Sequence, residues 1–202
     1  MAKTVILIDG FNLYHAINVK KYCTYKWLNL AKLATCYVTK QDSIEGIYYF
    51  TALATWAPDK ERRHRTYIRA LKAHNVEVVF GEFKRKDKFC TKCRQYYRTF
   101  EEKQTDVNIA IYLLRLAIQD KYEKAIIISG DSDLIPSIDA VQKTFPTKKI
   151  GVVIPIGRAS ESLKNVADFH MKMKEKHLQT SQFPPSIPIE NGQSLQRPRL
   201  WQ

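Results

Sequence analysis

The stretch Thr4-Val-Ile-Leu-Ile-Asp9 opens the chain with a short apolar run that ends in an acid. The same arrangement returns at Ala125-Ile-Ile-Ile-Ser-Gly-Asp131. Continuous rather than alternating apolarity is typical of strands that are covered on both faces of a sheet. These two stretches therefore predict a sheet enclosed by helices, with an acid directly after each of two strands.

Around these stretches, between residues 3 and 155, short β-branched runs alternate with longer segments of helical period. The other predicted strands are Ile44–Ala54, Val76–Phe80 and Lys149–Ile154, and the predicted helices are Trp27–Tyr37, Asp59–His74 and Thr105–Gln119. In the last helix, Thr105 is the expected N-cap, and the expected apolar stripe is Val107, Ala110, Ile111, Leu114 and Ile118. The alternation predicts a three-layer α/β/α sandwich with a mainly parallel sheet.

The chain has 202 residues, which suits one domain with a tail. We expect a domain over residues 1–177, with a basic, cysteine-containing insertion at about 84–100. Residues 178–202 are rich in Pro, Ser and Gln and predict a flexible tail. Lys and Arg exceed Asp and Glu by 33 to 20, a net charge of +13, which indicates a polyanionic partner, with nucleic acid ahead of a membrane surface.

Several classes of protein are disfavoured by what the sequence lacks. Its four cysteines are too few and too scattered for a disulfide framework. The first apolar run is too short for a signal peptide, and no apolar run approaches the length of a membrane span. We therefore expect a cytoplasmic protein without a membrane partner.

Four acids lie at predicted element ends: Asp9, Asp131 and Asp133 follow strands, and Asp106 opens a helix. The carboxyl ends of parallel strands line one crevice, so these side chains should converge there. Carboxylates at close range repel one another unless a cation lies between them, and Mg²⁺ or Mn²⁺ is the usual oxygen-bound ion. Each acid alone could equally cap a helix or turn; the joint placement favours a metal site.

Three motifs make the resemblance specific: Val5-Ile-Leu-Ile-Asp9-Gly-Phe-Asn12, then Thr105-Asp106-Val-Asn108, then Ser129-Gly-Asp131-Ser-Asp133. In this order they resemble the NYN domain, LabA-like branch, of the PIN-like nuclease superfamily, over roughly residues 3 to 170. The resemblance implies a divalent-metal nuclease centre with Asp9, Asp106, Asp131 and Asp133 in the acidic positions. It also implies that Asn12 lies beside the metal and orients a water or a phosphate.

Two other readings fail on single positions. A haloacid-dehalogenase-type phosphatase needs a second acid two residues after the first, where this chain has Phe11. A Gly-Asp-Ser-Leu esterase would use Ser132 as its nucleophile, but position 133 is Asp and no His is placed as a base. No glycine-rich phosphate loop or dinucleotide-binding fingerprint is present.

Residues 84 to 98 carry seven bases and one acid, interleaved with aromatic residues. The candidate RNA-binding residues are Lys84, Arg85, Lys86, Lys88, Phe89, Lys92, Arg94, Tyr96, Tyr97 and Arg98. The bases would neutralise phosphates while the rings stack on unpaired bases, which favours single-stranded RNA. The alternative is a solvated hairpin whose aromatic residues pack on the domain. A second basic run, Lys60 to Arg65, could extend the phosphate track or form a solvated helix face.

Cys90 and Cys93 have the spacing of a zinc knuckle, but a structural Zn²⁺ site needs four ligands. Cys23, Cys36, His64 or His74 could complete it, or a second copy of the chain in a homodimer could supply its own pair. Plain reduced cysteines or a redox pair are the alternatives, and Cys36 itself is expected in the core.

Together these features predict an Mg²⁺- or Mn²⁺-dependent ribonuclease that hydrolyses phosphodiester bonds in single-stranded RNA. The alternative is a non-catalytic RNA-binding or regulatory module of the same fold. Nuclease activity on DNA is a third reading.

Overall fold

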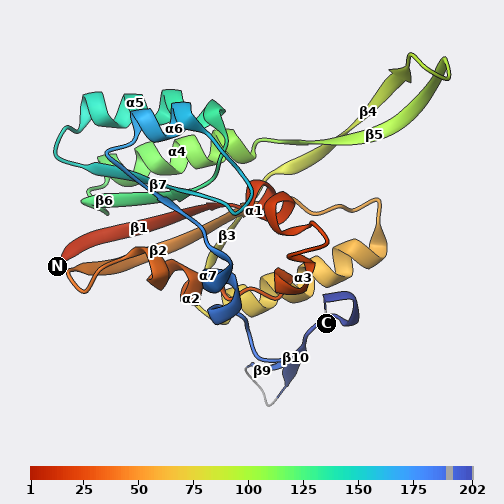
Figure 1. Ribbon diagram of the computed structural model, residues 1–202, viewed down its shortest axis with the longest axis horizontal. Coiled ribbons are helices and arrows are strands. Elements are labelled where there is room, and N and C mark those ends of the chain that lie inside the picture. Colours follow the sequence, from red (N-terminus) through yellow and green to blue (C-terminus); the bar gives the residue numbers. More distant parts are fainter. Residues whose placement is uncertain (190–192, 202) are drawn as a thin grey trace.

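The computed structural model describes residues 1–189 and 193–201. At its centre is a six-stranded sheet in the order β3-β2-β1-β6-β7-β8, in which all neighbouring strands run parallel (Figure 1). The strands are β1 (Ala2–Asp9), β2 (Asp42–Thr51), β3 (Glu77–Phe80), β6 (Lys124–Ile128), β7 (Lys149–Ile154) and β8 (Phe169–Lys172). The sequence predicts all of these except β8, a short edge strand that alternates between half-buried and exposed residues.

Helices cover both faces of the sheet, which confirms the predicted three-layer sandwich (Figure 1). One layer contains α1 (Gly10–Ile17), α2 (Leu30–Ala34), α3 (Pro58–Lys72) and α7 (Glu175–Thr180). The other contains α4 (Thr105–Ile118), α5 (Ile135–Thr144) and α6 (Glu161–Val166). Strand β1 shows why two cores form: Ile6 and Ile8 pack into the first layer, and Val5 and Leu7 into the second.

The apolar stripe that was expected to form the buried face of α4 is wrong. Its buried residues include Ile109, Leu113, Leu116 and Ala117, whereas Val107 and Ile118 are 60% and 65% exposed. Apolar residues lie almost all around this helix, so two registers with helical spacing compete, and only packing on the sheet decides between them. The expected cap is also wrong: the helix starts at Thr105, and Gln104 stands at the N-cap position with φ 77°.

The helix predicted over Trp27–Tyr37 is shorter than expected. Asn29 caps α2 by accepting a hydrogen bond from the Lys32 amide at 3.0 Å. A 3₁₀ turn, η2 (Thr35–Tyr37), follows, and further turns are η1 (Cys23–Lys26), η3 (Ser132–Leu134) and η5 (Arg199–Trp201). Cys36 is exposed in η2, so its expected place in the core is wrong, because the shortened helix turns it outward.

The basic insertion is an antiparallel hairpin of β4 (Glu82–Cys90) and β5 (Gln95–Lys103) that projects from the body of the protein (Figure 1). Aromatic rings anchor its base. Trp56 stacks on Phe100 with ring centroids 3.8 Å apart, and Phe83 meets the edge of Trp56 at 4.6 Å. These contacts fix the base of the hairpin beside the carboxyl edge of the sheet.

The end of the chain differs from the expected flexible tail over its described residues. A short ribbon of β9 (Ser186–Pro188) and β10 (Ser194–Gln196) lies against the domain, and Phe183, Ile187 and Leu195 are buried in its core. The composition suggests a tail, but these widely spaced apolar residues provide enough contact to hold the segment. No helix in the described part of the chain is long and apolar enough to cross a membrane.

Candidate active site

Asp9 is the last residue of β1 and is 3% exposed. One carboxylate oxygen accepts a hydrogen bond from the Asn12 amide at 2.9 Å, which caps α1. The other accepts a hydrogen bond from the Ser129 hydroxyl at 2.8 Å. Capping and site formation are therefore compatible, because a carboxylate has two oxygens and the cap uses one of them.

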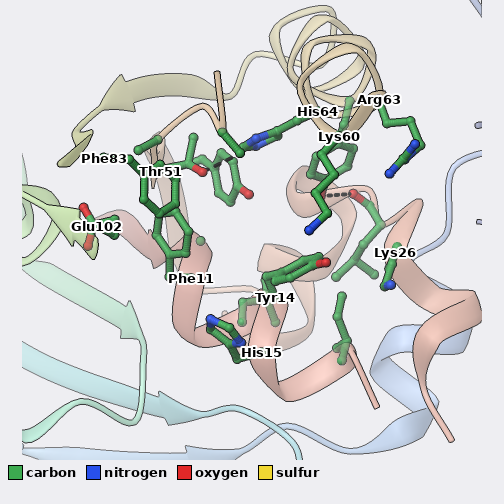
Figure 2. Close-up of a pocket in the computed structure, with 18 of the residues that line it drawn as sticks. Phe11, Tyr14, His15, Lys26, Thr51, Lys60, Arg63, His64, Phe83 and Glu102 are labelled. Carbon is green, nitrogen blue, oxygen red and sulfur yellow. Dashed lines mark hydrogen bonds between the residues drawn. The ribbon is translucent and has the colours of Figure 1, made fainter. Parts of the chain in front are cut away.

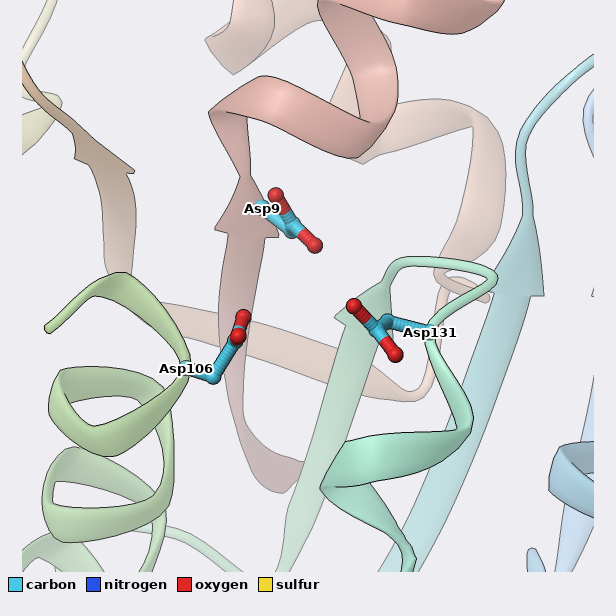
Figure 3. A group of neighbouring side chains, drawn as sticks. All are labelled: Asp9, Asp106 and Asp131. Atoms are coloured by element: carbon cyan, nitrogen blue, oxygen red, sulfur yellow. The ribbon is translucent and has the colours of Figure 1, made fainter. Parts of the chain in front are cut away.

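Asp131 lies in the loop after β6, and Asp106 lies in the first turn of α4. Figure 3 shows the side chains of Asp9, Asp106 and Asp131 facing one another from these three elements. One carboxylate oxygen from each lies within 4.8 Å of those of the other two. We call these three residues the acidic trio. Their convergence is what strand-end topology predicts for a parallel sheet.

Burial and mutual repulsion raise the pKa of two members of the trio. Asp9 has a raised pKa chiefly because it is buried, although hydrogen bonds from Asn12 and Ser129 oppose the change. Half-buried Asp106 has a pKa of about 6, raised first by burial and then by the negative charges of Asp9, Asp131 and Glu102. Three carboxylates held this closely favour either protonation or a bound cation.

The two other predicted catalytic residues lie around the trio. The Asn12 side-chain oxygen accepts a hydrogen bond from the Gly130 amide at 3.0 Å, so Asn12 ties the start of α1 to the loop that carries Asp131. Asp133 is exposed and lies outside the trio. Its amide donates to the Asp131 carboxylate at 3.0 Å, and its charge contributes to the raised pKa of Asp106.

Glu102 is an acid that the motifs do not identify. It lies near the end of β5, and its negative charge raises the pKa values of both Asp9 and Asp106. Its carboxylate accepts hydrogen bonds from the amide of Thr105, at 3.0 Å, and from the hydroxyl of Thr105. The sequence contains one signal for this residue, because Glu102 comes only four residues before Asp106. Such a short separation keeps the base of the hairpin close to the trio.

The predicted RNA-binding residues divide between the two faces of the hairpin, because paired residues of antiparallel strands share a face and successive residues alternate. One face carries Lys84, Lys86, Lys88 and Tyr97, and the other carries Arg85, Phe89, Tyr96 and Arg98. Three lysines surround Glu101 on the first face and lower its pKa to about 2. The rings near the tip are exposed, with Tyr96 at 77%, rather than packed on the domain.

The cysteine pair lies at the tip of the hairpin, with Cys90 as the last residue of β4. Hydrogen bonds from Cys93 and from the Lys92 amide lower the pKa of the Cys90 thiol. Among the described residues, no third Cys, His, Asp or Glu joins the pair to form a metal-binding group. Cys23, Cys36, His64 and His74 therefore do not complete a zinc site there.

Figure 2 shows a cavity of about 430 Å³. It lies beside the acidic trio, because Gly10 and Phe11 directly follow Asp9 and the charge of Glu102 acts on Asp9 and Asp106. It is bounded by α1, the end of β2, α3 and the base of the hairpin. Phe11 and Glu102 lie at the side next to the trio, and Lys60, Arg63 and His64 of α3 lie opposite. The second predicted basic run thus divides: Lys60 and Arg63 face the cavity, whereas Arg62 and Arg65 form ion pairs with Asp59 and Glu61.

Two known proteins are similar to this chain along most of its length. A protein named 6-hydroxy-3-succinoylpyridine 3-monooxygenase HspA, from Pseudomonas putida (strain DSM 28022 / S16), is 24% identical, and the alignment covers 92% of this chain and 72% of that protein. The crystal structure of VPA0982, a protein of unknown function from Vibrio parahaemolyticus RIMD 2210633, superposes with a TM-score of 0.58 at 19% identity. It covers 86% of this chain and 94% of that one, and it supports the fold.

The family match includes the trio, the hairpin and most of the residues that line the cavity. Residues 3–174 match the NYN domain family. These residues contain nearly all of the central sheet and all three converging carboxylates. The chain therefore belongs to the NYN domain family, within the PIN-like nuclease superfamily.

Proposed function

We propose that this protein is a divalent-metal-dependent ribonuclease that hydrolyses phosphodiester bonds in single-stranded RNA. The observation that carries the proposal is the acidic trio at the carboxyl edge of the sheet in a chain with a net charge of +13. A small anionic pocket within a basic protein suits an enzyme that binds a polyanion and needs a cation at the reacting phosphate. Membership of a nuclease superfamily supports the same reaction class.

The trio fits Mg²⁺ or Mn²⁺ by the chemistry of its donors, since these ions prefer carboxylate oxygens and keep several waters. Asp9, Asp106 and Asp131 would hold the ion. A bound ion there supplies Lewis-acid activation of a water and charge neutralisation at a phosphate oxygen. Burial first, and then repulsion between the carboxylates, raises the pKa values of Asp9 and Asp106, and a bound cation would relieve that repulsion.

Residues around the trio hold its carboxylates in place. The Ser129 hydroxyl and the Asn12 amide fix both oxygens of Asp9, and the Asn12 side chain fixes Gly130. We assign Asn12 and Ser129 as positioning residues. Asp133, exposed beside the trio, can act through a water in the outer part of the site.

Single-stranded RNA is the proposed substrate because of the hairpin. Its exposed rings offer stacking platforms for unpaired bases, and its cations offer phosphate contacts. A LabA-like assignment and a cytoplasmic location belong to the same proposal, the latter supported by four free cysteines.

The test is incubation of the protein with end-labelled single-stranded RNA in Mg²⁺, Mn²⁺ or EDTA. Cleavage should need the metal and should fall at least a hundredfold in Asp106→Asn and Asp131→Asn. Asp139→Asn is the matched control, because Asp139 lies on α5 and pairs with Lys143. Salt-sensitive RNA binding without metal-dependent cleavage would instead identify a non-catalytic RNA-binding module. Faster cleavage of single-stranded DNA in parallel reactions would identify a deoxyribonuclease.

A second candidate function comes from the cavity and from the name of one relative. The Pseudomonas protein is named as a monooxygenase of a hydroxylated succinoylpyridine, which is a small aromatic acid. A cavity of about 430 Å³ with aromatic walls and cations is large enough for such a molecule. This candidate predicts binding of pyridine carboxylates in the cavity and no RNA cleavage.

A further inference from the structure

The cavity beside the trio combines three kinds of groups that the proposed cleavage chemistry does not use. Figure 2 shows rings from α1 and the hairpin, cations from α3 and η1, and the neutral polar side chains of Thr51 and His64. No residue of the acidic trio lines it. The cavity is therefore a compartment next to the reacting centre.

Aromatic side chains form much of its walls. Phe11 and Tyr14 come from α1, and Trp56, Phe83 and Phe100 come from the loop after β2 and from the hairpin. Phe100 stacks on Trp56, and the Nζ of Lys26 lies 5.5 Å from the Tyr14 ring centroid. Trp56 and Tyr14 are still each 40% exposed, so part of each ring is available to a ligand. A flat heteroaromatic ring gains stacking energy from such walls, whichever nucleic-acid base it belongs to.

Three cations lie around the cavity without ion-pair partners among the described residues: Lys26, Lys60 and Arg63. Partial burial lowers the pKa of Lys26, and the nearby charge of Arg63 lowers it further. Neighbouring cations in α3 behave differently, since Arg62 and Arg65 each have an acid at 2.8 and 2.7 Å. Cations that lie close together without acidic partners repel one another, and an anion bound between them relieves that repulsion.

Where the end of β2 meets α3, the cavity has neutral hydrogen-bonding groups. His64 lies 3.4 Å from the Thr51 hydroxyl, and burial, helped by the charge of Arg65, lowers its pKa to about 4. Burial raises the pKa of Tyr49 to about 12. Both side chains are uncharged at neutral pH, as suits the edge of a neutral base rather than a second anion.

The cavity lies between the acidic trio and the hairpin face that carries Arg85 and Arg98. Gly10 and Phe11 directly follow Asp9, and Glu102 acts on Asp9 and Asp106 from the cavity wall. Phe83, Phe100 and Glu102 share one hairpin face with Arg85, Arg98, Phe89 and Tyr96. A strand that runs along this face toward the trio would therefore pass the mouth of the cavity.

We propose that the cavity binds one nucleotide of the RNA strand next to the scissile phosphate. The base inserts among Phe11, Tyr14 and Trp56 and meets His64 and Thr51 at its edge, and a flanking phosphate binds Lys60 and Arg63. This inference rests on the proposed ribonuclease function. It makes the cavity the part of the enzyme that distinguishes one base from another, whereas the hairpin contacts are tolerant of sequence.

The experiment measures binding of nucleoside 5′-monophosphates and of the matching nucleosides by calorimetry in EDTA, where no metal can hold the phosphate. Arg63→Gln should weaken monophosphate binding about tenfold and leave nucleoside binding unchanged, because it removes a phosphate contact. Tyr14→Leu should weaken both ligands about tenfold through lost stacking. Arg62→Gln, one residue away and facing Asp59, is the matched control and should change neither.

Three outcomes would overturn the inference. The first is equal monophosphate binding by Arg63→Gln and Arg62→Gln. The second is no detectable binding of any of the four monophosphates by a protein that still cleaves RNA, which leaves the nuclease proposal standing. The third is tighter binding of nicotinate, a pyridine carboxylate, than of any nucleotide. Nucleotide binding that needs Arg63 in a protein without cleavage would support the cavity assignment and refute the nuclease proposal.

Discussion

The hydroxyl of Ser129 donates a hydrogen bond to the carboxylate of Asp9 at 2.8 Å, and this bond links the ends of the two central strands of the sheet. Ser129 is fully buried, and its oxygen also accepts a hydrogen bond from the amide of Asp131 at 3.1 Å. One hydroxyl thus sets the orientation of Asp9 and the path of the loop that carries Asp131. The spacing of the trio depends on it.

We predict that Ser129→Ala lowers RNA cleavage and Mn²⁺ affinity by about ten- to a hundredfold, the usual cost of removing a partner that orients a metal ligand. The Ser129 bond lowers the pKa of Asp9, so its loss raises that pKa further. Raising the pH from 7 to 8.5 should therefore recover part of the lost activity. Ser137→Ala is the control, because Ser137 lies in α5 and its hydroxyl donates to the Leu134 carbonyl of η3. Equal activity of the two variants would contradict this role of Ser129.

The acidic trio should make the metal-free protein less stable as the pH rises. Asp106 has a pKa of about 6 in the folded protein against 3.8 ordinarily, so the folded state holds its proton more tightly. Its contribution to stability is complete below pH 3.8 and is lost as the pH rises through 6. In EDTA, Asp106→Asn should therefore melt at a higher temperature than wild type at pH 7.5, and the difference should shrink at pH 5. A difference that is the same at both pH values would contradict the assignment.

Glu102 should tune the trio through its charge. Replacing it with Gln keeps the oxygen that accepts from the Thr105 amide but removes a negative charge that raises the pKa of Asp106. The midpoint of the pH dependence of Mn²⁺ binding should shift to lower pH. Glu101→Gln is the matched control, because three lysines already surround Glu101 on the opposite hairpin face. Equal midpoints in the two variants would exclude this influence.

We propose that Cys90 and Cys93 at the tip of the hairpin bind a zinc ion shared by two copies of the chain. The Arg94 amide donates to the Cys90 carbonyl at 2.8 Å, and Arg94 adopts φ 54°, so a tight turn brings Cys93 back toward Cys90. Two cysteines supply half of a tetrahedral site, and the described residues of one chain supply no third ligand. Native mass spectrometry should find one Zn²⁺ per two chains, lost together with the dimer in Cys90→Ser and retained in Cys36→Ser. Zinc-free monomers would contradict this prediction.

The sequence predicts the acidic trio well because its geometry follows from topology. Strand direction alone brings Asp9 and Asp131 to one edge, and a helix that begins beside that edge adds Asp106. The register of α4 was not predictable in the same way. Val107 and Ile109 are both apolar, and only packing against β1 and β2 decides which of them is buried.

The cavity lies beyond sequence reasoning because segments distant from one another in the chain form it. The stacking of Trp56 on Phe100 joins a loop to a hairpin, and no periodicity indicates such a contact. One signal was nevertheless present. Lys60, Arg63, His64 and Tyr67 have the spacing of a single helix face, and all four line the cavity. Arg62 and Arg65 lie outside this face and pair with acids on the helix surface. The helical spacing therefore separates the basic residues that line the cavity from those that face solvent.

The most direct test of the account is to measure Mn²⁺ binding by electron paramagnetic resonance and RNA cleavage in the same samples. We predict that the cleavage rate follows Mn²⁺ occupancy over the whole titration in the wild-type protein. In Asp106→Asn, the occupancy curve should shift at least tenfold to higher Mn²⁺, and cleavage should fall with it, whereas Asp139→Asn should match the wild type. Cleavage that persists in EDTA, or Mn²⁺ binding and cleavage that are both unchanged in Asp106→Asn, would contradict the claim that the acidic trio is the metal centre of a ribonuclease.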